Sequence, residues 1–204
     1  MPRPRRTLAW ALAACAALAA VAGARVLLTV EEALALAFPD ATIERRTVFL
    51  TTAERARVAE LAGGEPGSAI VHPYVARRDG ALVGTAYFDA HLVRTLAETV
   101  MVTVDAQGRL GRVEVLSFDE PPEYLPRRAW YRQFDGRSLD AELELRRAIR
   151  PVAGATLTAR ATTAAARRVL ALHRVLEEAQ RAAARGAAPP SEAESSGRTP
   201  RPAR

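Results

Sequence analysis

Cysteine is almost absent from this chain, which has one cysteine, Cys15, and three histidines among its 204 residues. A single cysteine excludes a disulfide framework, a four-cysteine zinc site, a cysteine-ligated iron–sulfur cluster and a C-x-x-C-H haem attachment. We therefore expect no metal site. Any redox centre would have to be held by other residues.

Lysine is absent altogether, and the formal net charge of +6 comes from arginine. Residues 1–6 hold three arginines, and residues 181–204 hold five arginines against two glutamates, so each terminal segment carries +3. Residues 7–180 are therefore neutral overall. A basic surface that follows a nucleic-acid backbone needs its charge on the folded part, so the charge pattern argues against nucleic acid as a partner.

Common active-site patterns are also missing. The sequence has no P-loop, no dinucleotide-binding glycine fingerprint and no catalytic-triad pattern. Asp119, Glu120 and Glu123 lie close together, but no nucleophile or matched acid–base pair accompanies them. We assign no catalytic residue.

An unbroken apolar run, Leu8–Ala24, follows the first arginines. Positive charge followed by apolar residues is typical of an export signal, and Ala22–Ala24 is a candidate cleavage site. Uncleaved, the run could continue through Val26–Leu28 as an apolar anchor helix. A third option, lipidation of Cys15, is disfavoured by the short apolar stretch before it. All three options predict a protein outside the cytoplasmic membrane, either periplasmic or on the outer face of the cell membrane.

The remaining sequence predicts one domain over residues 29–185, after a signal peptide or signal anchor in residues 1–28. A tail over residues 186–204, rich in Pro, Ser, Ala and Arg, is expected to be disordered. The Thr-x-x-Glu spacing at Thr29 and a stop at Pro39 favour one short early helix, and capping by Thr51 or Thr52 with a stop at Gly63–Gly64 favours a second. The predicted early segments are helix 30–38, strand 42–50 and helix 52–61.

Alternating apolar residues predict an antiparallel sheet of consecutive hairpins, with tight turns at Asp79–Gly80 and Gln107–Gly108. The strands are expected at 70–78, 81–90, 99–105 and 110–118. A proline loop without regular structure, 119–125, and a short helix, 126–134, should follow. A long helix, 157–185, carries an apolar stripe that would pack on the sheet. The fold class predicted is α+β.

One junction has the residues of an anion site. Gly154 and Ala155 leave the backbone uncluttered, and Thr156 presents a hydroxyl where the long helix begins. Free N–H groups and the positive end of the helix dipole stabilise a phosphate at such a place. A threonine there is also a common helix cap.

Residues 153–159, Ala-Gly-Ala-Thr-Leu-Thr-Ala, resemble the flavinylation motif of FMN-binding domains, Ser/Thr-Gly-Ala-Thr. Such domains occur in extracytoplasmic subunits of sodium-pumping NADH:quinone reductases and Rnf complexes, in nitrous-oxide reductase regulators and in small exported proteins. Residues 119–126 and 130–137 are similar to the proline loop and the W-x-x-Q-F-x-G-K/R segment of the small members. Residues 87–89 and 94–99 resemble their central hairpin.

The resemblance implies an extracytoplasmic electron-transfer protein whose FMN is attached by a phosphoester to Thr156. Such a protein is an electron carrier or a component of a redox complex rather than a stand-alone enzyme. A flavin transferase would mature it, and a membrane or extracytoplasmic redox partner would exchange electrons with it. The cofactor-binding residues that the resemblance and the local chemistry suggest are Thr156, Gly154, Ala155, Thr158, Glu120, Tyr124 and His91.

The sequence departs from the motif at two positions. Ala153 stands where the family has Ser or Thr, and Arg150 stands where Asp is common. These departures leave open an alternative from another class: a non-redox extracytoplasmic module of the same fold that binds a ligand or partner without covalent flavin. In that case Thr156 would be an ordinary helix cap.

Overall fold

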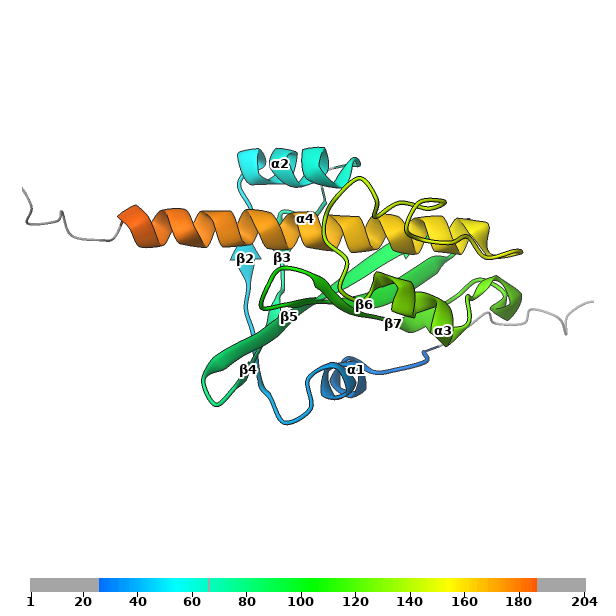
Figure 1. Ribbon diagram of the computed structural model, residues 1–204, viewed down its shortest axis with the longest axis horizontal. Coiled ribbons are helices and arrows are strands. Elements are labelled where there is room, and N and C mark those ends of the chain that lie inside the picture. Colours follow the sequence, from blue (N-terminus) through cyan, green and yellow to red (C-terminus); the bar gives the residue numbers. More distant parts are fainter. Residues whose placement is uncertain (1–25, 66, 187–204) are drawn as a thin grey trace, which may run out of the picture.

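The computed structural model describes residues 26–65 and 67–186. A five-stranded antiparallel sheet of order β1-β4-β5-β6-β7 lies between the long helix α4 on one face and α1 on the other (Figure 1). The helices are α1 (Val30–Ala37), α2 (Thr52–Ala62), α3 (Arg128–Tyr131) and α4 (Thr156–Gly186). The strands are β1 (Thr42–Arg45), β2 (Val48–Phe49), β3 (Ile70–Val71), β4 (Tyr74–Arg78), β5 (Ala81–Leu92), β6 (Ala97–Asp105) and β7 (Leu110–Phe118). The α+β class with a long C-terminal helix is confirmed.

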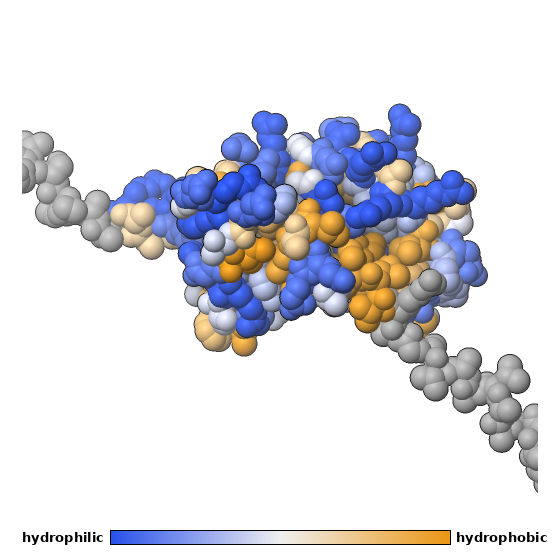
Figure 2. Space-filling model, turned by 90° about the horizontal axis from the view of Figure 1, so that it is seen from below, coloured by the Kyte–Doolittle hydropathy of each residue, from blue (hydrophilic) through white to orange (hydrophobic). Residues whose placement is uncertain are grey.

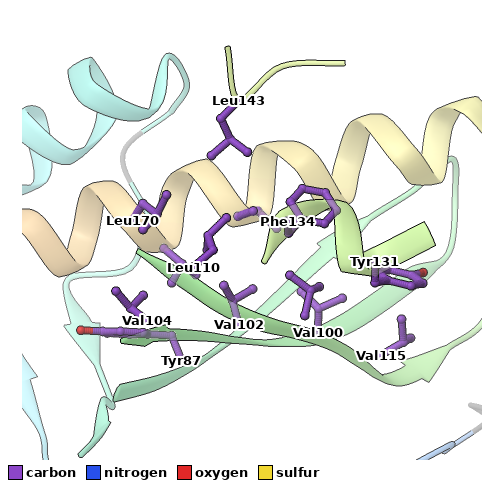
Figure 3. Close-up of a cluster of buried hydrophobic side chains, with 14 of the residues drawn as sticks. Tyr87, Val100, Val102, Val104, Leu110, Val115, Tyr131, Phe134, Leu143 and Leu170 are labelled. Atoms are coloured by element: carbon purple, nitrogen blue, oxygen red, sulfur yellow. The ribbon is translucent and has the colours of Figure 1, made fainter. Parts of the chain in front are cut away.

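The central strands have the predicted alternation of faces. Val100, Val102 and Val104 of β6 lie in the cluster beneath α4, whereas Met101 between them joins the cluster beneath α1. Figure 3 shows the three valines pointing from the sheet toward the helix, where Leu170 meets them. Both faces of β6 are thus buried, and this strand is the centre of the core.

Helix α1 begins with the predicted capping box, and α2 begins at the predicted cap Thr51, which forms a capping box as well. Thr29 and Thr51 each accept a backbone N–H three residues later, and Glu32 and Glu54 accept the N–H of the cap in return. Helix α2 packs against α4 rather than against the sheet. The β4–β5 turn is also as predicted, with positive φ at Asp79 and Gly80.

Three segment predictions need correction. Segment 42–50 forms two strands that pair with different partners, β1 with β4 and β2 with β3. Segment 70–78 is likewise divided, at Pro73, which has no N–H for a ladder. Loop 119–125 contains a 3₁₀ turn, Pro122–Tyr124, with proline at its first position; a second 3₁₀ turn, Arg132–Phe134, follows α3.

The proposed apolar signal or anchor helix and the C-terminal tail fall in residues 1–25 and 187–204, which lie outside the described residues. Within the described part of the chain, no helix is both long enough and apolar enough to cross a membrane.

Candidate functional site

The site is built at the first turn of α4. The first i→i−4 hydrogen bond of this helix joins the N–H of Ala159 to the carbonyl of Ala155. The backbone N–H groups of Thr156, Leu157 and Thr158 therefore have no carbonyl partner within the helix. The hydroxyl of Thr156 donates to the Val152 carbonyl over 3.3 Å and is partly exposed. Unpaired amides and the helix dipole therefore surround an accessible hydroxyl.

The backbone before Thr156 leaves room for a ligand group. Gly154 has φ of 79°, a conformation that favours glycine. A Cβ built on Gly154 would meet no atom within 4 Å, and Ala153 beside it is exposed. Ala155 is buried and ties the turn to the core. This open turn, with its donors and its hydroxyl, fits a phosphate group.

Two residues of the upstream motif, Trp130 and Gln133, fix the backbone at Arg150, just before this turn. Trp130 Nε1 donates to the carbonyl of Arg150 at 2.7 Å, and Gln133 Oε1 accepts the N–H of Arg150 at 2.9 Å. Trp130 also packs edge-on against Tyr131 and Phe134. Because both hydrogen bonds use only the backbone of residue 150, arginine in place of aspartate leaves them intact.

Thr158 has a structural role that the sequence did not reveal. It is fully buried, and its hydroxyl donates to the carbonyl of Tyr124 at 2.7 Å. This bond fixes the proline loop to the first turn of α4. The Tyr124 ring is partly buried and lies 5.1 Å below the guanidinium carbon of Arg94, a cation–π contact.

Glu120 holds the turn between β5 and β6. One of its carboxylate oxygens accepts the backbone N–H groups of Arg94, Thr95 and Leu96 at 2.9–3.2 Å. The N–H of Thr95, with those of Leu96 and Arg94, lowers the pKa of Glu120. The structure therefore brings Thr156, Thr158, Tyr124 and Glu120 to one end of the molecule.

His91 belongs to a different cluster, between the sheet and α4. Its ring nitrogens lie 2.8 Å from Asp89 Oδ1 and 3.0 Å from Glu98 Oε2. Arg168 of α4 binds Asp89 through two nitrogens, at 2.7 and 3.0 Å, and Thr162 of α4 donates to Glu98 over 3.3 Å. Thr162 follows Thr156 by six residues, which is about 9 Å along a helix. His91 is thus not in the first turn of α4.

The charges of this cluster fit one another. Burial alone would lower the pKa of His91, but hydrogen bonds to Asp89 and Glu98 outweigh it and raise the pKa to about 9. Burial alone would raise the pKa of Asp89, but its bonds to His91 and Arg168 lower it to about 2. The imidazolium is therefore held between two carboxylates. A cavity of about 680 Å³ borders His91, Asp89 and Arg168.

Only a weak signal for these partners of His91 is present in the sequence. Asp89 and Glu98 lie inside the two hairpin segments that carry the resemblance, but nothing in their spacing paired them with α4. His173, without an identified partner in the sequence, lies 2.9 Å from the Tyr87 hydroxyl. Within the described residues, no group of three or more His, Cys, Asp or Glu side chains could hold a metal ion.

Residues 97–171 match the family model of the FMN-binding domain. This part of the chain is similar to FMN-binding domains. The match runs from the start of β6 into α4 and includes Thr156, and it indicates FMN as the cofactor. No curated protein matches the chain. The match thus supports a flavin-binding function, and the open turn before α4 fits the phosphate of that cofactor.

Proposed function

We propose that the protein is an extracytoplasmic electron carrier whose FMN is joined through its phosphate to Thr156. The observation that carries the proposal is the first turn of α4, where the Thr156 hydroxyl stands among unpaired amides behind an open glycine turn. Thr158, two residues later, is buried and already bonded. Thr156 is therefore the hydroxyl of this motif that a second protein can reach.

Attachment would require a flavin transferase and FAD. Thr156 Oγ1 would form the new bond to the phosphorus of the FMN half, the pyrophosphate P–O bond would break, and AMP would leave. The hydroxyl proton would pass to solvent, and no atom would change oxidation state. The bond from Thr156 to the Val152 carbonyl would be lost, since an ester oxygen has no proton to donate.

The negative charge of the phosphodiester would be stabilised by the helix terminus and by arginine. Arg160 lies four residues after Thr156, on the same helix face, and is exposed. Side chains on a helix lean toward its N-terminus, so Arg160 can reach toward the phosphate. The exposed Arg150 lies before the turn and can add a second positive charge.

Bound FMN would supply the redox chemistry, accepting and releasing electrons. The chain would supply its position and its surroundings: the proline loop held by Thr158, and the β5–β6 turn held by Glu120. Because no second redox motif occurs in the sequence, the donor and the acceptor would be other proteins or quinols. The apolar run in residues 8–24 supports a place outside the cytoplasmic membrane.

Intact-mass spectrometry tests the attachment. The full chain would be produced with and without a co-expressed flavin transferase, as wild type and as Thr156→Ala, Thr156→Ser and Thr158→Ala. We expect a mass gain of one FMN less water in wild type and in Thr156→Ser. Thr158→Ala should show the same gain, because the Thr158 hydroxyl that it removes is buried and is not the proposed attachment site. Thr156→Ala should show no gain.

The same experiment separates the alternative. Purified wild type with neither a mass gain nor bound yellow flavin would favour the non-redox module, for which Ala153 and Arg150 are the supporting residues. Yellow protein without a mass gain would mean noncovalent FMN. Either result would reject the proposed ester.

A further inference from the structure

Apolar side chains are exposed where the described chain begins. Val26 is 66% exposed, Leu27 39% and Leu36 of α1 45%. Leu27 and Leu36 border a cavity of about 290 Å³, whose lining also includes Leu125, Pro126 and the charged residues Glu114 and Arg128. Figure 2 shows an apolar area on this face, beside the point at which the described chain begins. We define Val26, Leu27, Leu36 and the partly exposed Leu125 as the N-terminal apolar surface. A surface of this kind commonly marks a contact site.

The sequence limits how far this surface can lie from the apolar run. Only Arg25 separates Ala24, the last residue of the run, from Val26. Two steps of chain span at most roughly 7 Å. The backbone of Leu27 is also fixed to the sheet, because its N–H donates to the Leu116 carbonyl at 2.7 Å. If the run lies in a bilayer, the domain must be close to that bilayer.

Positive charge borders the N-terminal apolar surface. Arg127, Arg128 and Arg132 follow Pro126 and are exposed, and Arg128 also binds Glu114 at 3.1 Å. The exposed acids on the adjoining segments are Glu31 and Glu32 of α1, of which Glu32 caps the helix, and Glu123 of the proline loop. Apolar side chains beside arginines are suited to the interface of an anionic lipid bilayer, with the arginines at the headgroups.

We propose that the N-terminal apolar surface rests on the membrane in which the apolar run is anchored, and that the Thr156 end of the domain faces this membrane. Figure 1 shows the first turns of α4 at the same end of the molecule as the start of the described chain, with Gly186 at the opposite end. The contacts agree: Thr158 binds Tyr124, and Leu125, next in the chain, borders the cavity with Leu27.

The consequence of this orientation for electron transfer rests on the proposed function, in which Thr156 carries the flavin. FMN on Thr156 would face the lipid surface, so its electron partner would be a quinol or a redox group at the membrane. A partner that approaches from the aqueous side would instead meet the far half of α4.

The test is fluorescence quenching by lipid. The full chain with Cys15→Ala would be reconstituted without flavin transferase into vesicles of phosphatidylglycerol and headgroup spin-labelled phosphatidylcholine. A fluorophore would be attached to Leu36→Cys or Leu157→Cys, and to Arg174→Cys, exposed in the far half of α4, as the control. We expect quenching at Leu36 and Leu157 at least threefold stronger than at Arg174.

Two further variants show which surface makes the contact. Leu27→Glu should at least halve the quenching at Leu36→Cys, whereas Ile70→Glu, at a 46% exposed site on β3, should not change it. Circular dichroism would confirm that both variants fold.

Equal quenching at the three labelled positions would overturn the proposal, as would absence of vesicle binding. Quenching at Leu36 without quenching at Leu157 would also reject the placement of the Thr156 end. A dimer that hides Leu36 from lipid would do the same. No flavin is present, so failure here is distinct from failure of attachment, which the mass measurement reports.

Discussion

At the scale of single residues, ion pairs join the sheet to α4. His91, Asp89, Glu98 and Arg168 bring two positive and two negative side chains into one mostly buried cluster. Removal of one member would leave a buried charge without its partner, which is more costly than never having the pair. Glu98 is fully buried, and within the described residues its Oε1 accepts no hydrogen bond, so His91 is its main compensation.

This cluster predicts a pH dependence of stability. The pKa of His91 is raised to about 9 in the folded state, so its contribution is complete below the unfolded value near 6.5 and is lost as pH rises through about 9. Wild type should lose on the order of 3 kcal/mol of unfolding free energy between pH 6.5 and pH 9.5. Urea denaturation at both values measures the loss. The chain has no lysine, so few other groups titrate in this range.

His91→Gln is the control for that prediction. Glutamine cannot titrate, so the variant should be less stable than wild type at pH 6.5 and nearly independent of pH up to 9.5. An equal loss in both proteins would show that another group is responsible.

A second residue prediction concerns Thr158. Thr158→Val keeps the side-chain shape but removes the donor to the Tyr124 carbonyl, which should cost about 1 to 3 kcal/mol of unfolding free energy. Thr95→Val, at an exposed position, should change stability by less than about 0.5 kcal/mol. Thermal denaturation of the two variants measures the difference. Equal stability of Thr158→Val and Thr95→Val would show that the Thr158 hydrogen bond does not stabilise the fold.

At the scale of elements, β6 and the Phe38 ring, which follows α1, both lie close to Gly84 of β5. A Cβ on this residue would lie 2.6 Å from the Val104 carbonyl oxygen and 3.1 Å from Phe38. Gly84→Ala should therefore destabilise the protein by about 2 to 3 kcal/mol. Gly64→Ala, where a Cβ meets nothing within 4 Å, is the matched control. Chemical denaturation that finds both variants equal to wild type would contradict this packing.

Helix caps and tight turns that are determined by residues close in sequence were predictable. The capping box at Thr29, the cap at Thr51 and the turn at Asp79–Gly80 depend on residues within one turn of each other, and the structure has all three. The division of segment 42–50 was not predictable, because it follows from pairing with two different strands. The same holds for His91, whose cluster joins Asp89 to Arg168 across 79 positions.

At the scale of the whole molecule, the motif residues converge although they are distant in sequence. Trp130 and Gln133 hold the backbone of Arg150, and Thr158 holds the proline loop, so one end of α4 gathers three segments. The resemblance indicated that these segments belong to one family, and the match over residues 97–171 confirms it. What the sequence could not provide was their contacts, since hydrogen bonds to backbone atoms leave no mark in residue spacing.

The most direct test of the account is the position of the flavin in the chain. Trypsin cleavage after Arg147 and Arg160 releases residues 148–160, in which Thr156 and Thr158 are the hydroxyl residues. Tandem mass spectrometry of this peptide, from protein matured with the flavin transferase, should find FMN on fragments that contain Thr156 and not on fragments that begin at Leu157. FMN on Thr158, or a peptide that remains unmodified while the transferase labels another substrate, would contradict the account.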